Sequence, residues 1–140
     1  MTMSAQTAGR PVEILLVEDN PGDIRLTIEV LKEAEVRSNL SVVKDGVDAM
    51  AFLRREGHYT DAPRPDLILL DLNLPKKDGL ELLSDMNLDQ NLKDIRVVIL
   101  TTSEAEKDIH KSFDLDASSY IIKPIDVDRL MMVLKPTESA

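Results

Sequence analysis

Short apolar runs alternate with segments of helical spacing along this chain, and this alternation constrains the fold more than any other feature. The runs that we interpret as strands lie at 12–17, 40–43, 67–70, 96–100 and 120–122. Predicted helices follow them at about 21–34, 47–54, 80–86, 104–113 and 127–134. Strands that alternate with helices form a parallel sheet, because each crossover packs its helix against a face of the sheet. The pattern therefore predicts an α/β protein with five parallel strands.

The spacing of apolar residues also predicts which side of a helix is buried. In the first helix, Ile24, Ile28 and Leu31 recur at helical spacing after the Asn20-Pro21 start signal. In the second helix, we expect four side chains to face inward: Val47, Met50, Ala51 and Arg54.

Length and composition limit the class of protein. With 140 residues the chain suits one domain, which we place at 12–135 between tails at 1–11 and 136–140. No apolar run approaches the ~18 residues that a membrane helix requires, and residues 1–10 lack the apolar stretch of a secretory signal. The chain has no cysteine, which excludes disulfides, thiolate metal sites and thiol nucleophiles. We expect a cytoplasmic protein.

The charge of the chain argues against a nucleic-acid partner. Acidic residues outnumber basic ones by 26 to 17, which gives a formal charge of −9. Proteins that bind DNA carry basic patches that neutralise phosphates. We therefore expect neither nucleic acid nor membrane as a direct partner, and we interpret most of the carboxylates as solubilising surface charge.

Polar side chains follow four of the five predicted strands, at the point where each strand ends. They are Glu18 and Asp19, Asp71 and Asn73, Thr101, and Lys123 with Pro124. Ligands of parallel α/β sheets bind outside the carboxyl ends of the strands, so these residues should gather at one edge. Each alone is compatible with a turn or a helix cap. It is the combination of four strand ends that indicates a site.

The chemistry of this set favours a phosphoryl group held together with a metal ion. Three neighbouring carboxylates repel one another, and Mg²⁺ relieves the repulsion because it prefers oxygen ligands. A lysine and a hydroxyl are groups that a phosphoryl group needs on its remaining oxygens. Aspartate can accept a phosphoryl group and form an acyl phosphate. The sequence thus predicts Mg²⁺-dependent phosphoryl chemistry on a carboxylate.

With these residues in view, the chain closely resembles the receiver domains of two-component response regulators. The matching segments read ILLVEDN (14–20), LILLDLNLPKKDG (67–79), VVILTTS (97–103) and ASSYIIKP (117–124). The resemblance covers about residues 12–134. It implies a flavodoxin-like (βα)5 fold, doubly wound, with strand order 2-1-3-4-5.

The resemblance also implies a role for each residue at the strand ends. Asp71 would be the phosphoacceptor and a metal ligand, and Asp19 would bind Mg²⁺ directly. Glu18 would bind it directly or through water, and Asn73 through its backbone carbonyl. Lys123 would contact a phosphoryl oxygen.

Three further positions carry the switch that the resemblance implies. Thr101 would offer the hydroxyl that bonds the phosphoryl group, and Tyr120 would move between an exposed position and one behind Thr101. The peptide bond between Lys123 and Pro124 is expected to be cis. The output surface would comprise the fourth helix, the fifth strand and the fifth helix.

Two segments of the chain resemble one group of receivers, and two other positions differ from what receivers commonly have. The long connection at 55–66 and the NPGDIRL segment (20–26) are similar to single-domain regulators associated with phytochrome-type and other sensory histidine kinases. Members of that group often dimerise through the last helix and strand. Here the last helix is short and Pro136 stops it, so we expect a monomer or a weak homodimer. Asp116 stands where receivers commonly have glycine.

The expected function is a phosphorylation switch, with a sensor histidine kinase as phosphodonor and a downstream partner protein. One alternative is a constitutive interaction module with a degenerate site, although such modules usually lack the acceptor or the lysine. Another is a Mg²⁺-dependent aspartyl-phosphate phosphatase. A phosphatase of that kind needs a general acid two residues after its nucleophile, and Asn73 cannot exchange a proton there. We expect no enzyme activity beyond slow loss of the protein's own phosphoryl group.

Overall fold

The computed structural model describes residues 11–72, 74, 79–102 and 119–134. Its strands are β1 (Val12–Val17), β2 (Ser38–Val43), β3 (Leu67–Asp71), β4 (Arg96–Thr101) and β5 (Ser119–Ile122). Its helices are α1 (Pro21–Glu33), α2 (Gly46–Arg54), α3 (Gly79–Asn87) and α5 (Val127–Leu134), with a 3₁₀ turn at Gly57–Tyr59. The helix predicted at 104–113 lies outside the described residues, as do nearly all of the two predicted tails.

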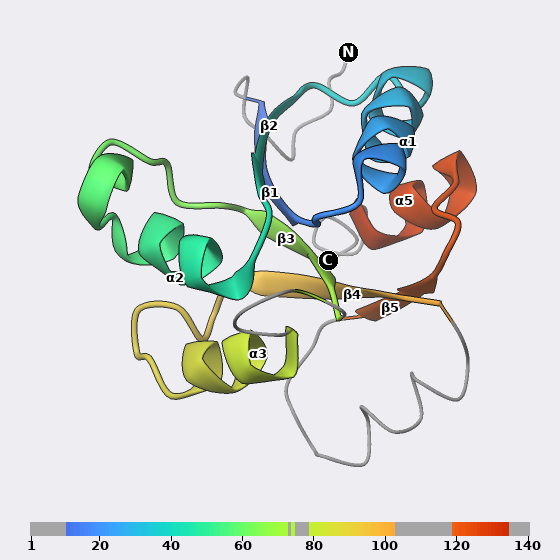
Figure 1. Cartoon of the computed structure of the whole chain (residues 1–140). Helices are drawn as coiled ribbons and strands as arrows, with labels where there is room; N and C mark the ends of the chain where they lie inside the picture. The colour runs from blue at the N-terminus through green and yellow to red at the C-terminus, as the bar shows by residue number, and fades with distance from the viewer. Residues whose placement is uncertain (1–10, 73, 75–78, 103–118, 135–140) are drawn as a thin grey trace.

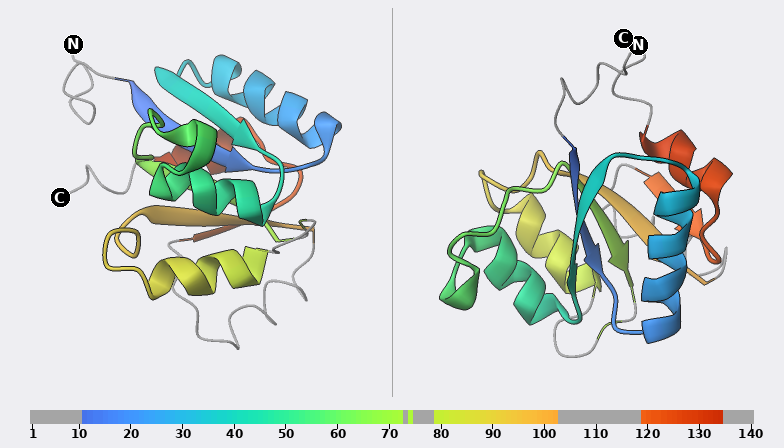
Figure 2. Two further views of the ribbon diagram at one scale, coloured as in Figure 1. Left: turned by 60° about the vertical axis from the view of Figure 1, so that its left-hand side comes forward. Right: turned by 90° about the horizontal axis from the view of Figure 1, so that it is seen from above.

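The five strands form one parallel sheet in the order β2-β1-β3-β4-β5 (Figure 1). This is the predicted flavodoxin-like order. Helices α1 and α5 cover one face of the sheet, and α2 and α3 cover the other (Figure 2). The central strands β3 and β4 are almost continuously apolar because both of their faces are buried.

Two apolar clusters fill the spaces between the sheet and its helices. One lies under α2 and α3 and includes Leu15, Ile68 and Leu82, all fully buried. The other lies under α1 and α5 and includes Leu16, Leu69 and Leu130, also fully buried. Successive residues of a strand point to opposite faces, which is why neighbours such as Ile68 and Leu69 belong to different clusters.

Local signals set the starts of the first two helices. The Asn20 side chain accepts a hydrogen bond from the backbone N–H of Asp23 at 3.0 Å, and Pro21 occupies the first helical position. The Asp45 side chain accepts from the N–H of Asp48 at 2.7 Å and caps α2 in the same way.

The predicted buried face of α2 is right at Met50, which is buried, and at Ala51, which is half-buried, but wrong at Val47 and Arg54. Val47 is 51% exposed and Arg54 is exposed, whereas Phe52 and Leu53 are buried. The observed orientation is favoured because Phe52 and Leu53 together remove more apolar surface from water than Val47 and the stem of an arginine would. In α1, Leu31 is buried as predicted, whereas Ile28 is 36% exposed. Thr27 lies inside, where its hydroxyl donates to the Asp23 carbonyl at 2.9 Å.

The described helices include none that is long and apolar enough to span a membrane.

Candidate phosphoacceptor and metal site

Strand register brings the predicted site residues to one edge of the sheet. Val17 pairs with Leu70, Asp71 with Leu100, and Thr101 with Ile122. The residues that follow these pairs therefore leave the sheet at the same level. The structure thus gathers Glu18, Asp19, Asp71, Thr101 and Lys123 at the carboxyl edge, as expected for a parallel sheet.

Three carboxylates form the acidic part of the site. One oxygen from each of Glu18, Asp19 and Asp71 lies within 4.8 Å of the other two. Glu18 and Asp71 are 1% and 6% exposed, whereas Asp19 is open to solvent. This donor set fits Mg²⁺, which takes oxygen ligands and keeps several waters on its open side. Asn73, the fourth predicted ligand, lies outside the described residues.

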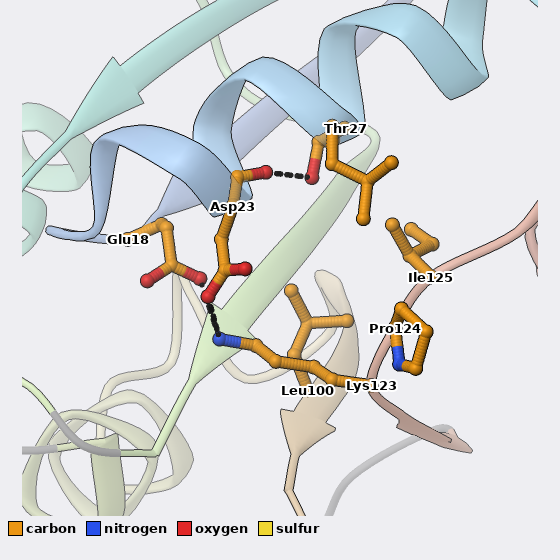
Figure 3. Close-up of a pocket in the computed structure, with 8 residues that line it drawn as sticks. Glu18, Asp23, Thr27, Leu100, Lys123, Pro124 and Ile125 are labelled. Atoms are coloured by element: carbon orange, nitrogen blue, oxygen red, sulfur yellow. Dashed lines mark hydrogen bonds and ion pairs between the residues drawn. The ribbon is translucent and has the colours of Figure 1, made fainter.

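The Lys123 ammonium forms the basic part of the site. Its Nζ donates to Glu18 Oε1 at 2.9 Å, Asp23 Oδ2 at 2.8 Å and Asp71 Oδ2 at 3.1 Å. Its side chain is only 15% exposed. Figure 3 shows the lysine reaching from the end of β5 toward Glu18 and Asp23. One cation therefore connects β1, α1, β3 and β5.

Apolar packing fixes the direction of this lysine. A cavity of about 10 Å³, lined by residues including Leu26, Leu100 and Ile125, lies beside it (Figure 3). That volume admits about one water molecule at most. With so little free space at its stem, the lysine holds its ammonium at the carboxylates.

Two groups of the site, Glu18 and Lys123, have raised pKa values. Burial, reinforced by the neighbouring Asp71 carboxylate, raises the pKa of Glu18 to about 7 in spite of Lys123. Burial alone would lower the pKa of Lys123, but its bonds to Asp23 and Glu18 and the charge of Asp71 outweigh burial and raise it. Lys123 therefore stays positively charged. One lysine does not supply enough positive charge to bring the pKa of Glu18 down to its ordinary value.

The predicted switch residues lie on β4 and on or just after β5. Thr101 ends β4, is 1% exposed, and its carbonyl accepts from the Lys123 backbone N–H at 2.7 Å. Tyr120 lies on β5 opposite Ile99, is half-buried, and burial raises its pKa. The Lys123-Pro124 peptide bond is cis, as predicted. The switch roles of Thr101, Tyr120 and Pro124 remain predictions.

Asp23 is a site residue that the sequence analysis missed. It lies in the first turn of α1, where an acidic residue is ordinarily explained by the helix dipole. Its carboxylate nevertheless makes the shortest of the three bonds to Lys123. The available signal was its place, one helical turn after Glu18-Asp19, which turns the side chain back over the same edge of the sheet.

A buried aspartate beside a lysine, a hydroxyl and two further carboxylates, at the carboxyl edge of a 2-1-3-4-5 sheet, defines a phosphoacceptor switch domain of the flavodoxin-like class. Comparison with known proteins agrees with this class. The model of the response regulator receiver domain family matches residues 14–135. The chain belongs to this family, and is thus a receiver-type protein of two-component signalling.

Its relatives include phytochrome response regulators. The chain is 46% identical to response regulator Rcp1 of Synechocystis over 92% of its own length and 88% of Rcp1. It is similar to the crystal structure of the phosphorylated cyanobacterial phytochrome response regulator RcpA, with a TM-score of 0.76, 50% identity and 91% of each chain covered. The bacteriophytochrome response regulator AtBRR has a TM-score of 0.85 at 36% identity, over 90% of this chain and 91% of that one.

Proposed function

We propose that Asp71 is the phosphoacceptor of this receiver and that a sensor histidine kinase is its phosphodonor. The observation that carries the proposal is the Lys123 ammonium, which lies 3.1 Å from Asp71 Oδ2 and is held by two other carboxylates. A cation kept at that position can neutralise an oxygen of an incoming phosphoryl group. Asp71 is also the buried carboxylate that ends the central strand β3.

In the proposed reaction an Asp71 carboxylate oxygen attacks the phosphorus of a phosphohistidine. A P–O bond forms, the P–N bond breaks, and the imidazole leaves with the electron pair and takes up a proton. Glu18, Asp19, Asp71 and the backbone carbonyl of Asn73 would hold Mg²⁺. The metal would supply positive charge to the phosphoryl oxygens.

The same geometry supports a switch. The phosphoryl group adds about −1.5 to −2 charges and three acceptor oxygens beside Thr101 and Lys123. Movement of Thr101 toward it would leave room for the Tyr120 ring and alter the surface at β5 and α5. We propose that a downstream protein reads this surface, with the chain as a monomer or a weak homodimer through the last helix and strand.

We propose that the domain spans 12–135 and acts in the cytoplasm without turnover of a substrate. The phytochrome regulators among its relatives make a phytochrome-type kinase the first donor to test. The phosphatase alternative remains disfavoured, since Asn73 stands where a general acid would be needed.

The experiment that tests the proposal is intact-mass measurement after incubation with phosphoramidate, with and without Mg²⁺, on the wild type and on Asp71→Asn. We expect one phosphoryl adduct that requires both Mg²⁺ and Asp71. An adduct that persists in Asp71→Asn would move the acceptor to another residue. Absence of any adduct, both from phosphoramidate and from a phosphorylated kinase, would favour the constitutive interaction module.

A further inference from the structure

A cleft of about 440 Å³ lies far from the phosphoacceptor, at the amino edge of the sheet. The C-terminal end of α2, the connection that follows it, and the segment between α3 and β4 form its walls. In Figure 1 these segments lie on the left of the molecule, away from α1 and α5. The connection at 55–66 is the stretch that is longer than a receiver fold needs, and the function proposed above gives it no role.

Three arginines line this cleft in a chain whose formal charge is −9. Arg54 comes from the last turn of α2, Arg55 from its C-cap and Arg64 from the connection. Arg55 takes up a left-handed conformation (φ 57°), so its side chain leaves the helix in another direction than that of Arg54. The connection therefore contributes two of the three guanidinium groups.

Within the part of the chain that the structure describes, each guanidinium is anchored through one contact. Arg64 Nη1 donates to the Asn91 carbonyl at 2.6 Å, and Arg55 Nε donates to the Ala62 carbonyl at 2.9 Å. Arg54 Nε lies 3.5 Å from Asp89 Oδ2. A guanidinium has five N–H donors, and Arg55 and Arg64 have no carboxylate partner among the residues that the structure describes. The anchors restrict the side chains and leave donors for a ligand.

The floor and the remaining charges of the cleft favour an anion. Leu53 and Leu92, 9% and 3% exposed, form an apolar base that strengthens charge interactions above it. Asp89 is already paired with Arg54, which leaves Glu56 as the opposing carboxylate. The volume lies within the range of small-molecule sites.

We propose that this cleft binds a small organic phosphate. A tetrahedral phosphate group offers oxygens in several directions and can accept from guanidiniums on different walls. A planar carboxylate matches one fork at a time. Glu56 suits a hydroxyl of the ligand, for which it is an acceptor. The site is separate from Asp71 and does not depend on the proposed phosphorylation.

The test is a titration with pyrophosphate as probe, followed by amide NMR shifts in EDTA so that no metal bridges the anion to the carboxylates. We expect saturable shifts at 53–64 and 89–92 and none at 18–23. Arg64→Gln and Arg55→Gln should each weaken binding about tenfold, the effect of losing one charged hydrogen bond. Arg25→Gln, which removes the same charge from the exposed face of α1, should leave binding unchanged.

Other outcomes would overturn the proposal. Amide shifts that do not saturate with pyrophosphate, or an Arg25→Gln variant that weakens binding as much as the cleft variants do, contradict a site in the cleft. Citrate that binds as tightly as pyrophosphate, or an oligoglutamate peptide that binds where pyrophosphate does not, contradicts a preference for phosphate. Arg55 and Arg64 are exposed at the surface. The amide spectra of the two variants report directly whether they fold. They should still accept a phosphoryl group at Asp71, so failure here and failure of the proposed function are separable.

Discussion

At the scale of single residues, the site holds more negative charge than its lysine can balance. Three carboxylates (Glu18, Asp23 and Asp71) contact one ammonium, and a fourth, that of Asp19, lies beside those of Glu18 and Asp71. Burial, reinforced by the Asp71 carboxylate, raises the pKa of Glu18, and the carboxylates around Lys123 raise the pKa of the lysine against the effect of its burial. A phosphoryl group would add about two more negative charges. We therefore expect phosphorylation at this edge of the sheet to require a divalent cation.

The Glu18 pKa predicts how stability depends on pH without a divalent cation. Because the folded value, about 7, lies above the ordinary value of 4.5, the folded state binds the proton more tightly. This contribution to stability is fully present below pH 4.5 and is lost as pH rises through 7. In EDTA, the melting temperature of the wild type should therefore fall over this range relative to that of Glu18→Gln. Parallel pH profiles of the two proteins would contradict the assignment.

Removal of the Lys123 ammonium should destabilise the metal-free protein. Lys123→Ala leaves Glu18 and Asp71 buried without their counter-charge, which costs about 2 kcal/mol, a value reduced from that of a fully buried pair because Asp23 is partly in solvent. Mg²⁺ should restore most of the loss, since its carboxylate ligands remain. Urea unfolding with and without Mg²⁺ measures both effects.

Lys44→Ala is the control for this variant, because Lys44 is exposed. We expect it to unfold like the wild type. A Lys123→Ala protein as stable in EDTA as Lys44→Ala would show that the three ion pairs contribute nothing net.

At the scale of elements, α3 begins against the phosphoacceptor strand. A Cβ on Gly79 would lie 2.8 Å from the Asp71 carbonyl oxygen and 2.9 Å from Leu72 Cα. The Gly79 N–H also donates to the Leu72 carbonyl at 3.2 Å. Only glycine lets the helix approach the backbone this closely, so the position of α3 and that of Asp71 are linked.

Gly79→Ala should therefore push α3 away from the end of β3. We expect a loss of about 1–3 kcal/mol in the free energy of unfolding, as for overpacked sites. Labelling of Asp71 by phosphoramidate should slow in parallel. Thermal unfolding and intact mass measure the two effects.

The matched control is Gly22→Ala, whose Cβ would meet the end of the Asn20 side chain at 3.2 Å. That side chain can yield by a few tenths of an ångström, so the loss should be smaller. If Gly79→Ala and Gly22→Ala lose the same free energy of unfolding, the close contact between Gly79 and the Asp71 backbone does not contribute specifically to stability.

At the scale of the whole molecule, the proposed metal site gathers part of the negative charge of the chain at one edge of the sheet. The carboxylates of Glu18 and Asp19, which follow β1, and of Asp71, which ends β3, meet at one edge in a protein of formal charge −9. Mg²⁺ that binds the folded state alone stabilises it by mass action.

Mg²⁺ should raise the melting temperature. At a hundred times its Kd the gain is about 2.7 kcal/mol, which corresponds to about 5–10 °C for a domain of this size. Asp19→Asn should reduce the gain, because it removes the solvent-facing ligand. An equal rise from NaCl at the same ionic strength would mean that general screening, and no metal site, is responsible.

The sequence by itself determined the sheet and the content of the site. Continuous apolar runs and helical spacing are local signals, so β1 and α5 span the predicted residues, and β2 starts only two residues earlier. Parallel order then places the ends of several strands together, which is why Glu18, Asp71 and Lys123 were predicted as neighbours. Those conclusions follow from the pattern of apolar residues and from the topology of a parallel sheet, without knowledge of how the side chains pack.

Only the tertiary structure decided what depends on packing between elements. The rotation of α2, which buries Phe52 and exposes Val47, follows from the sheet surface beneath it. The third carboxylate on Lys123 is Asp23, 100 residues away in the chain. Its place early in α1 indicates the edge of the sheet where it lies, but not its contact with Lys123. The arginine cleft likewise joins α2 to the segment before β4. Periodicity shows where a helix lies, but its rotation and long-range partners are set by the shapes and charges of surfaces far along the chain.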